Sequence, residues 1–296
     1  MTETALPVPK MKTPRSSYKS WIGVAPFFLF AILFLFLPSL RLFVGSFTTE
    51  AGDFTLANVT ELITQKYILD AYLLSIKISA VTALGGGILG FLLAYSVTVG
   101  GLPKSLRSAL ITFSGVASNF AGVPLAFAFV ATLGRTGFIT AVLKDVFGIN
   151  IYSAGFNLYS FTGLCLTYMY FQFPLMVLIM APALDGLKRE WREAAENLGA
   201  SSFQYWTRVA MPVLLPSILG AMILLFGNAF GAYATAYALT GGRLPIITIQ
   251  IGAQVRGDVL HNPGLGNAMA MGMVFIMAIS LAGYSWLQGK TERWLK

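Results

Sequence analysis

Long apolar runs separated by short polar segments dominate the chain, and six of these runs are long enough to cross a lipid bilayer as helices. A membrane-spanning helix needs about 20 mostly apolar residues. None of the runs alternates with the period of two that a β-barrel strand would show. The sequence therefore predicts an all-α integral membrane protein. Its spans are expected at about 21–47, 71–97, 109–133, 158–184, 213–239 and 268–287.

The polar segments between the spans predict one six-span domain over 21–289 and no second soluble domain. Residues 1–20 and 290–296 are basic, and we expect them to form tails. The segment 134–157 is polar enough for a loop and leaves room for a short lateral helix. The segment 240–267 predicts a second long loop, and the polar residues from 48 to 67 predict a third.

The segment 186–212 differs from the rest because it is amphipathic and charged. Apolar side chains recur at i, i+3, i+4 and i+7, which predicts one face of a helix. These residues are Trp191, Ala194, Ala195 and Leu198. Gly199 is placed to end this helix, and Ser201 with Gln204 predicts a capping box that opens a second short helix, which Pro212 ends. Such a hairpin has nothing to bury against in water, so we expect it to bind a partner.

Composition supports a membrane protein and excludes several other classes. The chain is 56% hydrophobic and only 11% charged, whereas soluble domains contain about a quarter charged residues. A single cysteine, Cys165, and a single histidine, His261, exclude a disulfide framework and a Cys/His metal cluster. The net charge of +8 is explained by basic residues on the cytoplasmic side, so we expect no nucleic-acid partner.

The distribution of lysine and arginine predicts the orientation in the membrane. With the N-terminus in the cytoplasm, six spans return the C-terminus to the same side. The cytoplasmic segments then collect Lys10, Lys12, Arg15, Lys19, Lys104, Arg107, Lys188, Arg189, Arg192, Arg208, Lys290, Arg293 and Lys296. The outer segments keep Arg41, Lys66, Arg135, Lys144, Arg243 and Arg256. This orientation places the 186–212 hairpin in the cytoplasm, where ATP is available.

The hairpin carries a spaced motif that resembles a known family. Its residues are Glu193, Ala194, Ala195, Gly199, Val209 and Pro212. This pattern is similar to the EAA loop in permease subunits of binding-protein-dependent type I ABC importers, in the branch that includes polyamine, sulfate, molybdate and iron permeases. Val209 stands where isoleucine is usual and Met211 where leucine is usual. Because the six-span layout agrees with the motif, the resemblance extends over most of the chain.

The resemblance implies the partners and the location of the chain. In this family the loop docks into a groove on a cytoplasmic ABC ATPase dimer, which binds ATP and Mg²⁺ in place of the permease. A second permease subunit, identical or similar, completes the transmembrane part. A solute-binding protein outside the cytoplasm delivers the solute. The resemblance therefore implies a multi-pass protein of a prokaryotic cytoplasmic (inner) membrane that is not itself an enzyme.

Two glycine-rich stretches imitate nucleotide-binding motifs. Gly85–Gly90 fits G-x-G-x-x-G but lies inside an apolar span, where Gly86 and Gly90 more simply allow close helix packing. Gly289-Lys290-Thr291 imitates the end of a P-loop at the end of a span. No nucleophile, base and orienting residue occur together, so the sequence predicts no catalytic site, and this chain is expected to bind no cofactor.

Polar residues inside spans are candidates for the translocation pathway because they are expensive to place in lipid. The candidates are Asn228, Gln172, Tyr233 and Asn119. The alternative for the amides is hydrogen bonding between helices. Lys77 also lies in a span, and its stem is long enough to carry the charge to the outer interface.

The predicted function is transport of a small solute with energy from a separate ATPase. A polyamine or related small organic cation is favoured, since abundant aromatic rings supply cation–π contacts. An oxyanion, iron, an opine or an aminophosphonate remains an alternative substrate. The alternative mechanism is a secondary transporter driven by an ion gradient, which would need acidic residues inside the spans.

Overall fold

The computed structural model describes residues 18–49, 51–256 and 261–292, and six of its helices are long and apolar enough to cross a membrane. The predicted tails fall largely outside these residues. The helices are α1 (Tyr18–Ala31), α2 (Leu37–Ser46), α3 (Ala57–Thr64), α4 (Lys66–Thr98), α5 (Lys104–Asn119), α6 (Gly122–Leu133), α7 (Phe138–Phe147), α8 (Phe161–Asp185), α9 (Arg189–Asn197), α10 (Ser202–Tyr205), α11 (Met211–Phe230), α12 (Ala234–Thr240), α13 (Ile247–Arg256) and α14 (Pro263–Glu292).

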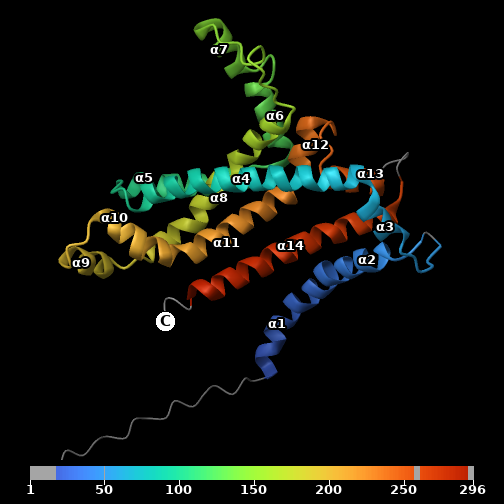
Figure 1. Ribbon diagram of the computed structural model, residues 1–296, viewed down its shortest axis with the longest axis horizontal. Helices are drawn as coiled ribbons and strands as arrows, with labels where there is room; N and C mark the ends of the chain where they lie inside the picture. Colours follow the sequence, from blue (N-terminus) through green and yellow to red (C-terminus); the bar gives the residue numbers. More distant parts are fainter. Residues whose placement is uncertain (1–17, 50, 257–260, 293–296) are drawn as a thin grey trace, which may run out of the picture.

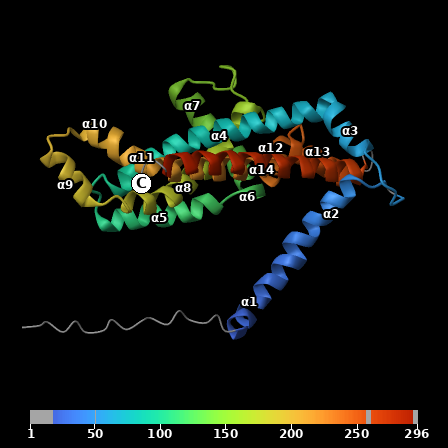
Figure 2. The same cartoon turned by 60° about the horizontal axis from the view of Figure 1, so that its bottom comes forward.

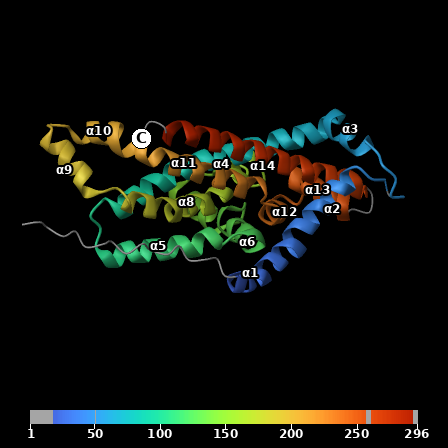
Figure 3. The same cartoon turned by 90° about the horizontal axis from the view of Figure 1, so that it is seen from below.

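The long helices α4, α8, α11 and α14 lie roughly along one direction and form the body of the molecule (Figure 1). Helices α9 and α10 occupy one end, together with the turn between α4 and α5 (Figure 3). Helices α3 and α13 occupy the other end. The α1–α2 arm leaves the body at that second end and diverges from it (Figure 2). The predicted all-α fold with six membrane-spanning helices is confirmed.

Glycines on α4 set its distance from α8. A Cβ atom added at Gly86 would lie 2.5 Å from the Cβ atom of Gln172, and one at Gly90 would lie 2.5 Å from the Cβ atom of Met176. Small residues at this spacing let helix backbones approach closely in lipid. The packing role predicted for Gly86 and Gly90 is therefore confirmed, and Gly85–Gly90 lie inside α4 instead of between a strand and a helix.

The third predicted span is not one helix. The chain leaves α5 at Asn119 and starts α6 at Gly122, and α6 with α7 turns away from the body (Figure 1). Gly122 has a φ of +74°, which a right-handed helix cannot contain. Pro124 cannot donate a hydrogen bond to the carbonyl four residues earlier, and its ring clashes there. These two residues explain why the apolar run from 109 to 133 breaks at Phe120.

The fifth predicted span also breaks, near its end, because α11 stops at Phe230 and α12 begins at Ala234. The two breaks lie side by side, and the backbone N–H of Gly122 donates to the Thr235 hydroxyl over 2.7 Å. The Tyr168 hydroxyl donates to the Ala232 carbonyl over 2.7 Å. Irregular backbone is tolerated at membrane depth only where its polar groups find partners inside the protein.

The predicted loops are partly helical. A short helix, α7, lies within 134–157, but it continues the third apolar segment Gly122–Phe147 instead of lying in a separate loop. The loops at 48–67 and 240–267 contain α3 and α13. Both of these helices pack on neighbours, α3 against α4 and α14, and α13 against α14 and α4. Ile247 and Ile249 of α13 are buried against the body, which anchors this helix within the predicted loop.

Candidate functional site

The hairpin between α8 and α11 is shaped by a backbone turn at Gly199. The N–H of Ala200 donates to the Ala195 carbonyl over 3.0 Å, and the N–H of Gly199 donates to the Glu196 carbonyl over 2.9 Å. This pair of bonds is the Schellman arrangement, which ends a helix with a left-handed residue. Gly199 has a φ of +76°, so a glycine is needed there for its backbone conformation.

The predicted capping box is present directly after this turn. The Ser201 hydroxyl accepts the N–H of Gln204 over 3.3 Å, and the Gln204 side chain accepts the N–H of Ser201 over 2.8 Å. The two bonds of the capping box give acceptors to two backbone N–H groups that would otherwise lack a partner at the start of the helix. The second helix of the hairpin therefore has a fixed beginning.

The second helix does not end at Pro212, which corrects the sequence prediction. The chain is helical from Ser202 to Phe230 without interruption. The segment Trp206–Ala210 is wound as a π-helix immediately before Met211 and Pro212. A wider turn accommodates a proline that lacks an N–H and whose ring would clash with a carbonyl of a regular α-helix. Val209 lies in this wider turn and is half-buried.

Ion pairs along α9 hold its charged side chains in place. Arg189 pairs with Glu193 at 3.0 Å and Arg192 pairs with Glu196 at 2.9 Å, both at the i,i+4 spacing. The hydrogen bond to the Glu196 carboxylate raises the pKa of Arg192 above its ordinary value. Ala194 is exposed and Ala195 is half-buried. Within the described chain α9 buries no residue, so this charged helix is fixed mainly by local bonds.

The root of the hairpin, unlike its tip, is tied to the body. Asp185 at the end of α8 pairs with Arg107 at the start of α5. The ring of Trp206 packs edge-to-face against Tyr95 of α4, with centroids 5.0 Å apart. Asp185 and Arg189, which bracket the hairpin in sequence, therefore have different partners instead of pairing with each other.

Large apolar side chains are exposed at the tip of the hairpin. Leu198 is 88% exposed and Phe203 is 77% exposed. Trp191 is partly exposed and lies under the ammonium group of Lys188, 5.8 Å from the ring centroid. Exposed apolar residues rimmed by charges are typical of a surface that contacts another protein. The tip therefore has the composition of an interface.

A cavity of about 390 Å³ lies where the two helix breaks meet. Its lining comes from α5, α6, α8, α11, α12 and the breaks between them: Ser118, Ala121, Gly122, Phe171, Gly227, Asn228, Gly231, Ala232, Tyr233, Ala234 and Thr235. The predicted pathway residues Asn228 and Tyr233 thus lie together. No charged side chain is among the described residues that line this cavity. It offers an amide, hydroxyls and aromatic faces, but no ion pair.

The other two predicted pathway residues lie outside the cavity lining. Gln172 is fully buried, and its amide donates to the Leu225 carbonyl over 2.9 Å and approaches the Thr82 hydroxyl at 3.5 Å. In this conformation it joins α8 to α11 and α4. Asn119 is exposed at the end of α5, where it donates to the Gly115 carbonyl over 2.9 Å.

Several site residues were not identified from the sequence. Phe171, Ser118 and Thr235 line the cavity because the helices break beside them, and neither break was predicted. The signal at the first break was the pair Gly122 and Pro124 inside an apolar run. The pairing of Arg107 with Asp185 was not predicted either, although opposite charges at the ends of neighbouring spans could have suggested it.

Comparison with known families and proteins gives one consistent result. The family model described as "Binding-protein-dependent transport system inner membrane component" matches residues 86–296. A probable sulfate transport system permease protein of Nephroselmis olivacea is 26% identical over 89% of both chains. The spermidine/putrescine transport system permease protein PotB of Haemophilus influenzae is 24% identical over 89% of this chain and 92% of its own. A putative ferric transport system permease protein of H. influenzae is 23% identical, but the match covers only 40% of it.

Solved structures share the fold. A bacterial ABC transporter involved in the import of the acidic polysaccharide alginate has a chain that superposes with a TM-score of 0.71, at 16% identity over 94% of this chain and 96% of that one. The MetNI methionine ABC transporter, in an inward-facing conformation, gives a TM-score of 0.54 at 16% identity over 77% of this chain and 99% of its own.

Proposed function

The chain belongs to the family of binding-protein-dependent transport system inner membrane components, and from this premise we propose that force from a separate ATPase reaches the membrane through its α9–α10 hairpin. It is the permease subunit of an ABC importer for small solutes. The partners that follow are an ABC ATPase dimer, a second permease subunit and a solute-binding protein. ATP and Mg²⁺ are bound by the ATPase.

The proposed orientation places the hairpin in the cytoplasm and the α3–α13 end outside it. The described basic residues near the hairpin end support this side: Lys104, Arg107, Lys188, Arg189, Arg192 and Arg208. Cytoplasmic segments of membrane proteins carry an excess of lysine and arginine. An ATPase can reach only that side. Both termini are then cytoplasmic as well.

The observation that carries the proposal is the unbroken helix between the hairpin and the cavity. Helix from Ser202 to Phe230 comprises 29 residues, which at 1.5 Å per residue is about 43 Å. The capping box lies at the N-terminal end of this helix, and Asn228, which lines the cavity, lies near its C-terminal end. A rigid helix that joins two sites lets a displacement at one bias the conformation at the other.

The proposed docking site is the tip of the hairpin. Glu193 presents a charge toward the ATPase groove, Ala194 and Ala195 allow close approach, and Gly199 sets the bend. Val209 and Pro212 position the helix that leaves the hairpin. The exposed side chains of Leu198 and Phe203 would become buried when the hairpin docks on the ATPase surface.

The proposal is tested with the importer reconstituted from this chain, its ATPase and its binding protein. In Glu193→Lys, uptake should fall by roughly tenfold or more, the scale of a lost coupling free energy of 1–3 kcal/mol. ATP hydrolysis should no longer respond to the binding protein, while the chain still inserts. Asp145→Lys reverses an exposed charge on α7, outside the hairpin, and should behave as wild type. Full transport by Glu193→Lys would refute the proposed coupling.

For the solute, we propose a small organic cation such as a polyamine. The cavity presents the rings of Phe171 and Tyr233 and the amide of Asn228, without a charged side chain in its described lining to repel a cation. A cation is attracted to aromatic faces, most strongly where water is excluded. A relative named as a spermidine/putrescine permease supports this class.

A second candidate is an oxyanion, favoured by the start of α6. This helix begins at the cavity, and the partial positive charge at a helix N-terminus attracts anions. The Gly122 N–H already donates to Thr235 and Pro124 has no N–H, so the attraction comes from the helix dipole. Relatives named as sulfate permeases support it. Uptake of labelled putrescine and of labelled sulfate by the complete importer separates the two. Tyr233→Leu should lower uptake of the cation, whereas Tyr67→Leu, an exposed tyrosine outside the cavity, should not.

A further inference from the structure

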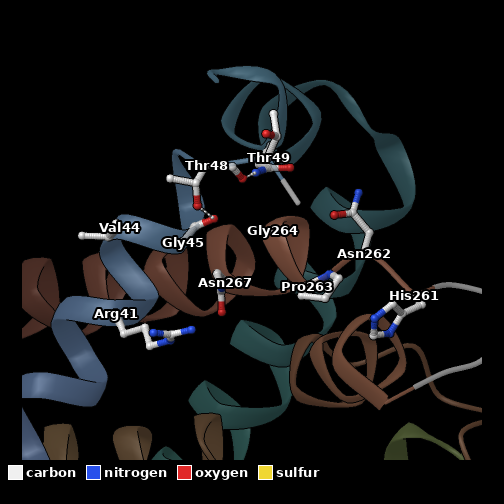
Figure 4. Close-up of a pocket in the computed structure, with 11 residues that line it drawn as sticks. Arg41, Val44, Gly45, Thr48, Thr49, His261, Asn262, Pro263, Gly264 and Asn267 are labelled. Atoms are coloured by element: carbon white, nitrogen blue, oxygen red, sulfur yellow. Dashed lines mark hydrogen bonds between the residues drawn. The ribbon is translucent and has the colours of Figure 1, made fainter. Parts of the chain in front are cut away.

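A polar cleft lies at the end of the body opposite to the hairpin, away from the cavity at the helix breaks. It has a volume of about 550 Å³ and is bounded by α2, α3, the loop between them and the start of α14 (Figure 4). We call it the α2–α14 cleft. Its polar side chains include Arg41, Thr48, Asn58, His261, Asn262 and Asn267. No carboxylate is among the described residues that line it.

Arg41 supplies the charge in this cleft. It belongs to the first membrane-spanning segment, Gly23–Ser46, and lies less than two turns from its end. An arginine within a span is costly unless it is paired or reaches a polar environment. Within the described part of the chain Arg41 forms no ion pair. Figure 4 shows its side chain extending from α2 toward the side of α14 that carries Asn267. The cleft therefore contains a cation that lacks a described anionic partner.

The remainder of the lining also favours a negative group. Gly45 has no side chain, and a Cβ atom there would collide with the Asn267 amide, so this glycine lets Asn267 lie against α2. The start of the 30-residue helix α14 faces the cleft, capped by Asn262, whose side chain accepts the N–H of Leu265 over 3.1 Å. The N-terminal end of a helix stabilises negative charge. Arg41 and this helix end therefore both attract a negatively charged group to the cleft.

The cleft continues into an apolar groove on the first span. This groove has a volume of about 540 Å³ and is lined by Leu33, Leu37, Pro38 and Leu40, together with Arg41 and Val44. Arg41 and Val44 also line the cleft, so the two spaces meet at these residues. A cationic polar space joined to an apolar groove along a membrane-spanning helix matches an amphiphile with a negative headgroup.

We propose that the α2–α14 cleft binds the phosphate-bearing headgroup of an anionic phospholipid, with one acyl chain along the groove on α1–α2. Arg41 pairs with the phosphate, since a guanidinium forms two parallel hydrogen bonds to such an oxyanion. The Asn267 amide contributes a further donor, and the start of α14 contributes the positive end of its dipole. A protein partner with an acidic residue could instead occupy this face, and wild type would then show no preference for an anionic lipid in the test below.

The test uses the assembled importer, purified and equilibrated with equal amounts of phosphatidylglycerol and phosphatidylcholine. Native mass spectrometry counts the lipids that remain bound. Phosphatidylcholine carries the same phosphate, but Arg41 repels its choline cation, so wild type should retain phosphatidylglycerol over phosphatidylcholine by about tenfold. Arg41→Gln should bring this ratio close to one, and Arg41→Lys should keep part of it. Arg243→Gln removes an exposed arginine outside the cleft and should leave the ratio unchanged.

Soluble probes distinguish a lipid from a free anion. Inorganic phosphate and glycerol 3-phosphate carry the same charged group without acyl chains, so they should compete with the bound lipid only weakly. The proposal is overturned if wild type shows no preference for phosphatidylglycerol, which requires no variant to fold. It is also overturned if Arg41→Gln keeps the full preference, or if inorganic phosphate binds as tightly as the lipid.

Discussion

The hairpin tip and the α4–α8 contact hold their shape by opposite means. Helix α9 buries no residue within the described chain and is fixed by ion pairs, a Schellman turn and an adjoining capping box. In the described chain, the contact between α4 and α8 has the long Gln172–Thr82 approach as its side-chain polar bond, and it is fixed by glycines that let the backbones meet. One region is specified by local chemistry and the other by shape.

The difference follows from what each region must contact. A helix that meets a partner has to keep its own conformation while its apolar side chains stay uncovered, and bonds between residues a few positions apart provide this. Two helices in lipid gain little from burying apolar surface, because the surroundings are equally apolar. They gain from close packing instead. Substitutions should therefore damage folding in the core and damage coupling in the hairpin.

The largest expected effect is on the core, at Gly90. A side chain there would meet both the Cβ atom of Met176 and the backbone carbonyl of Phe173, at 2.5 Å each. Because backbone cannot move aside cheaply, Gly90→Leu should cost about 3 kcal/mol or more and lower the yield of folded protein. The thermal midpoint of the purified chain measures this. Gly283→Leu is the matched control, since nothing lies within 4 Å of a Cβ atom there; equal losses in both variants would contradict the packing argument.

The next effect should appear at Gly199, and it should separate coupling from folding. A Cβ atom at Gly199 meets no neighbour, so Gly199→Ala is penalised only by the left-handed backbone, at about 1–2 kcal/mol. We expect reduced stimulation of ATP hydrolysis by the binding protein, with a thermal midpoint only a few degrees below wild type. Gly199→Asn should lose less, because asparagine tolerates this conformation. A Gly199→Ala importer with normal stimulation would show that the turn is not needed for coupling.

The sequence was most informative where structure is local. The turn at Gly199, the capping box at Ser201 and the packing role of Gly86 and Gly90 all follow from spacing within a few residues, and the structure contains them. The number of spans also follows, because hydropathy depends only on composition over about 20 residues. The roles of the individual hairpin and cavity residues in coupling and transport stay predictions.

The sequence was least informative where residues distant in the chain decide the outcome. The breaks at Phe120 and after Phe230 lie inside apolar runs, and each is stabilised by a bond to another segment. Gln172 was proposed for the pathway, yet its partners on α4 and α11 come from positions far away in sequence. Hydropathy cannot distinguish a pathway amide from a helix-joining one, because both are polar residues in an apolar run.

A smaller effect should follow from removing the capping box. Ser201→Ala leaves the Gln204 N–H without its acceptor and should cost about 1 kcal/mol locally. Hydrogen exchange of the Gln204 amide should therefore become about fivefold faster, since a tenfold change corresponds to 1.4 kcal/mol. The matched control is Ser202→Ala, which removes an exposed hydroxyl one position later. Unchanged exchange in Ser201→Ala would mean that the turn at Gly199 alone fixes the start of the helix.

The smallest effect should be seen on the exposed ion pairs of α9. Glu196→Gln removes the partner of Arg192, and at low salt amide exchange within α9 should rise by about twofold. The rise should disappear in 1 M salt, where the screening length falls to about 3 Å. Asp145→Asn removes an exposed carboxylate on α7 that has no ion pair in the described structure, and serves as control. A rise that persists at high salt would mean that Glu196 acts through packing instead of charge. The hairpin would then resemble the α4–α8 contact, and the contrast between the two regions would be wrong.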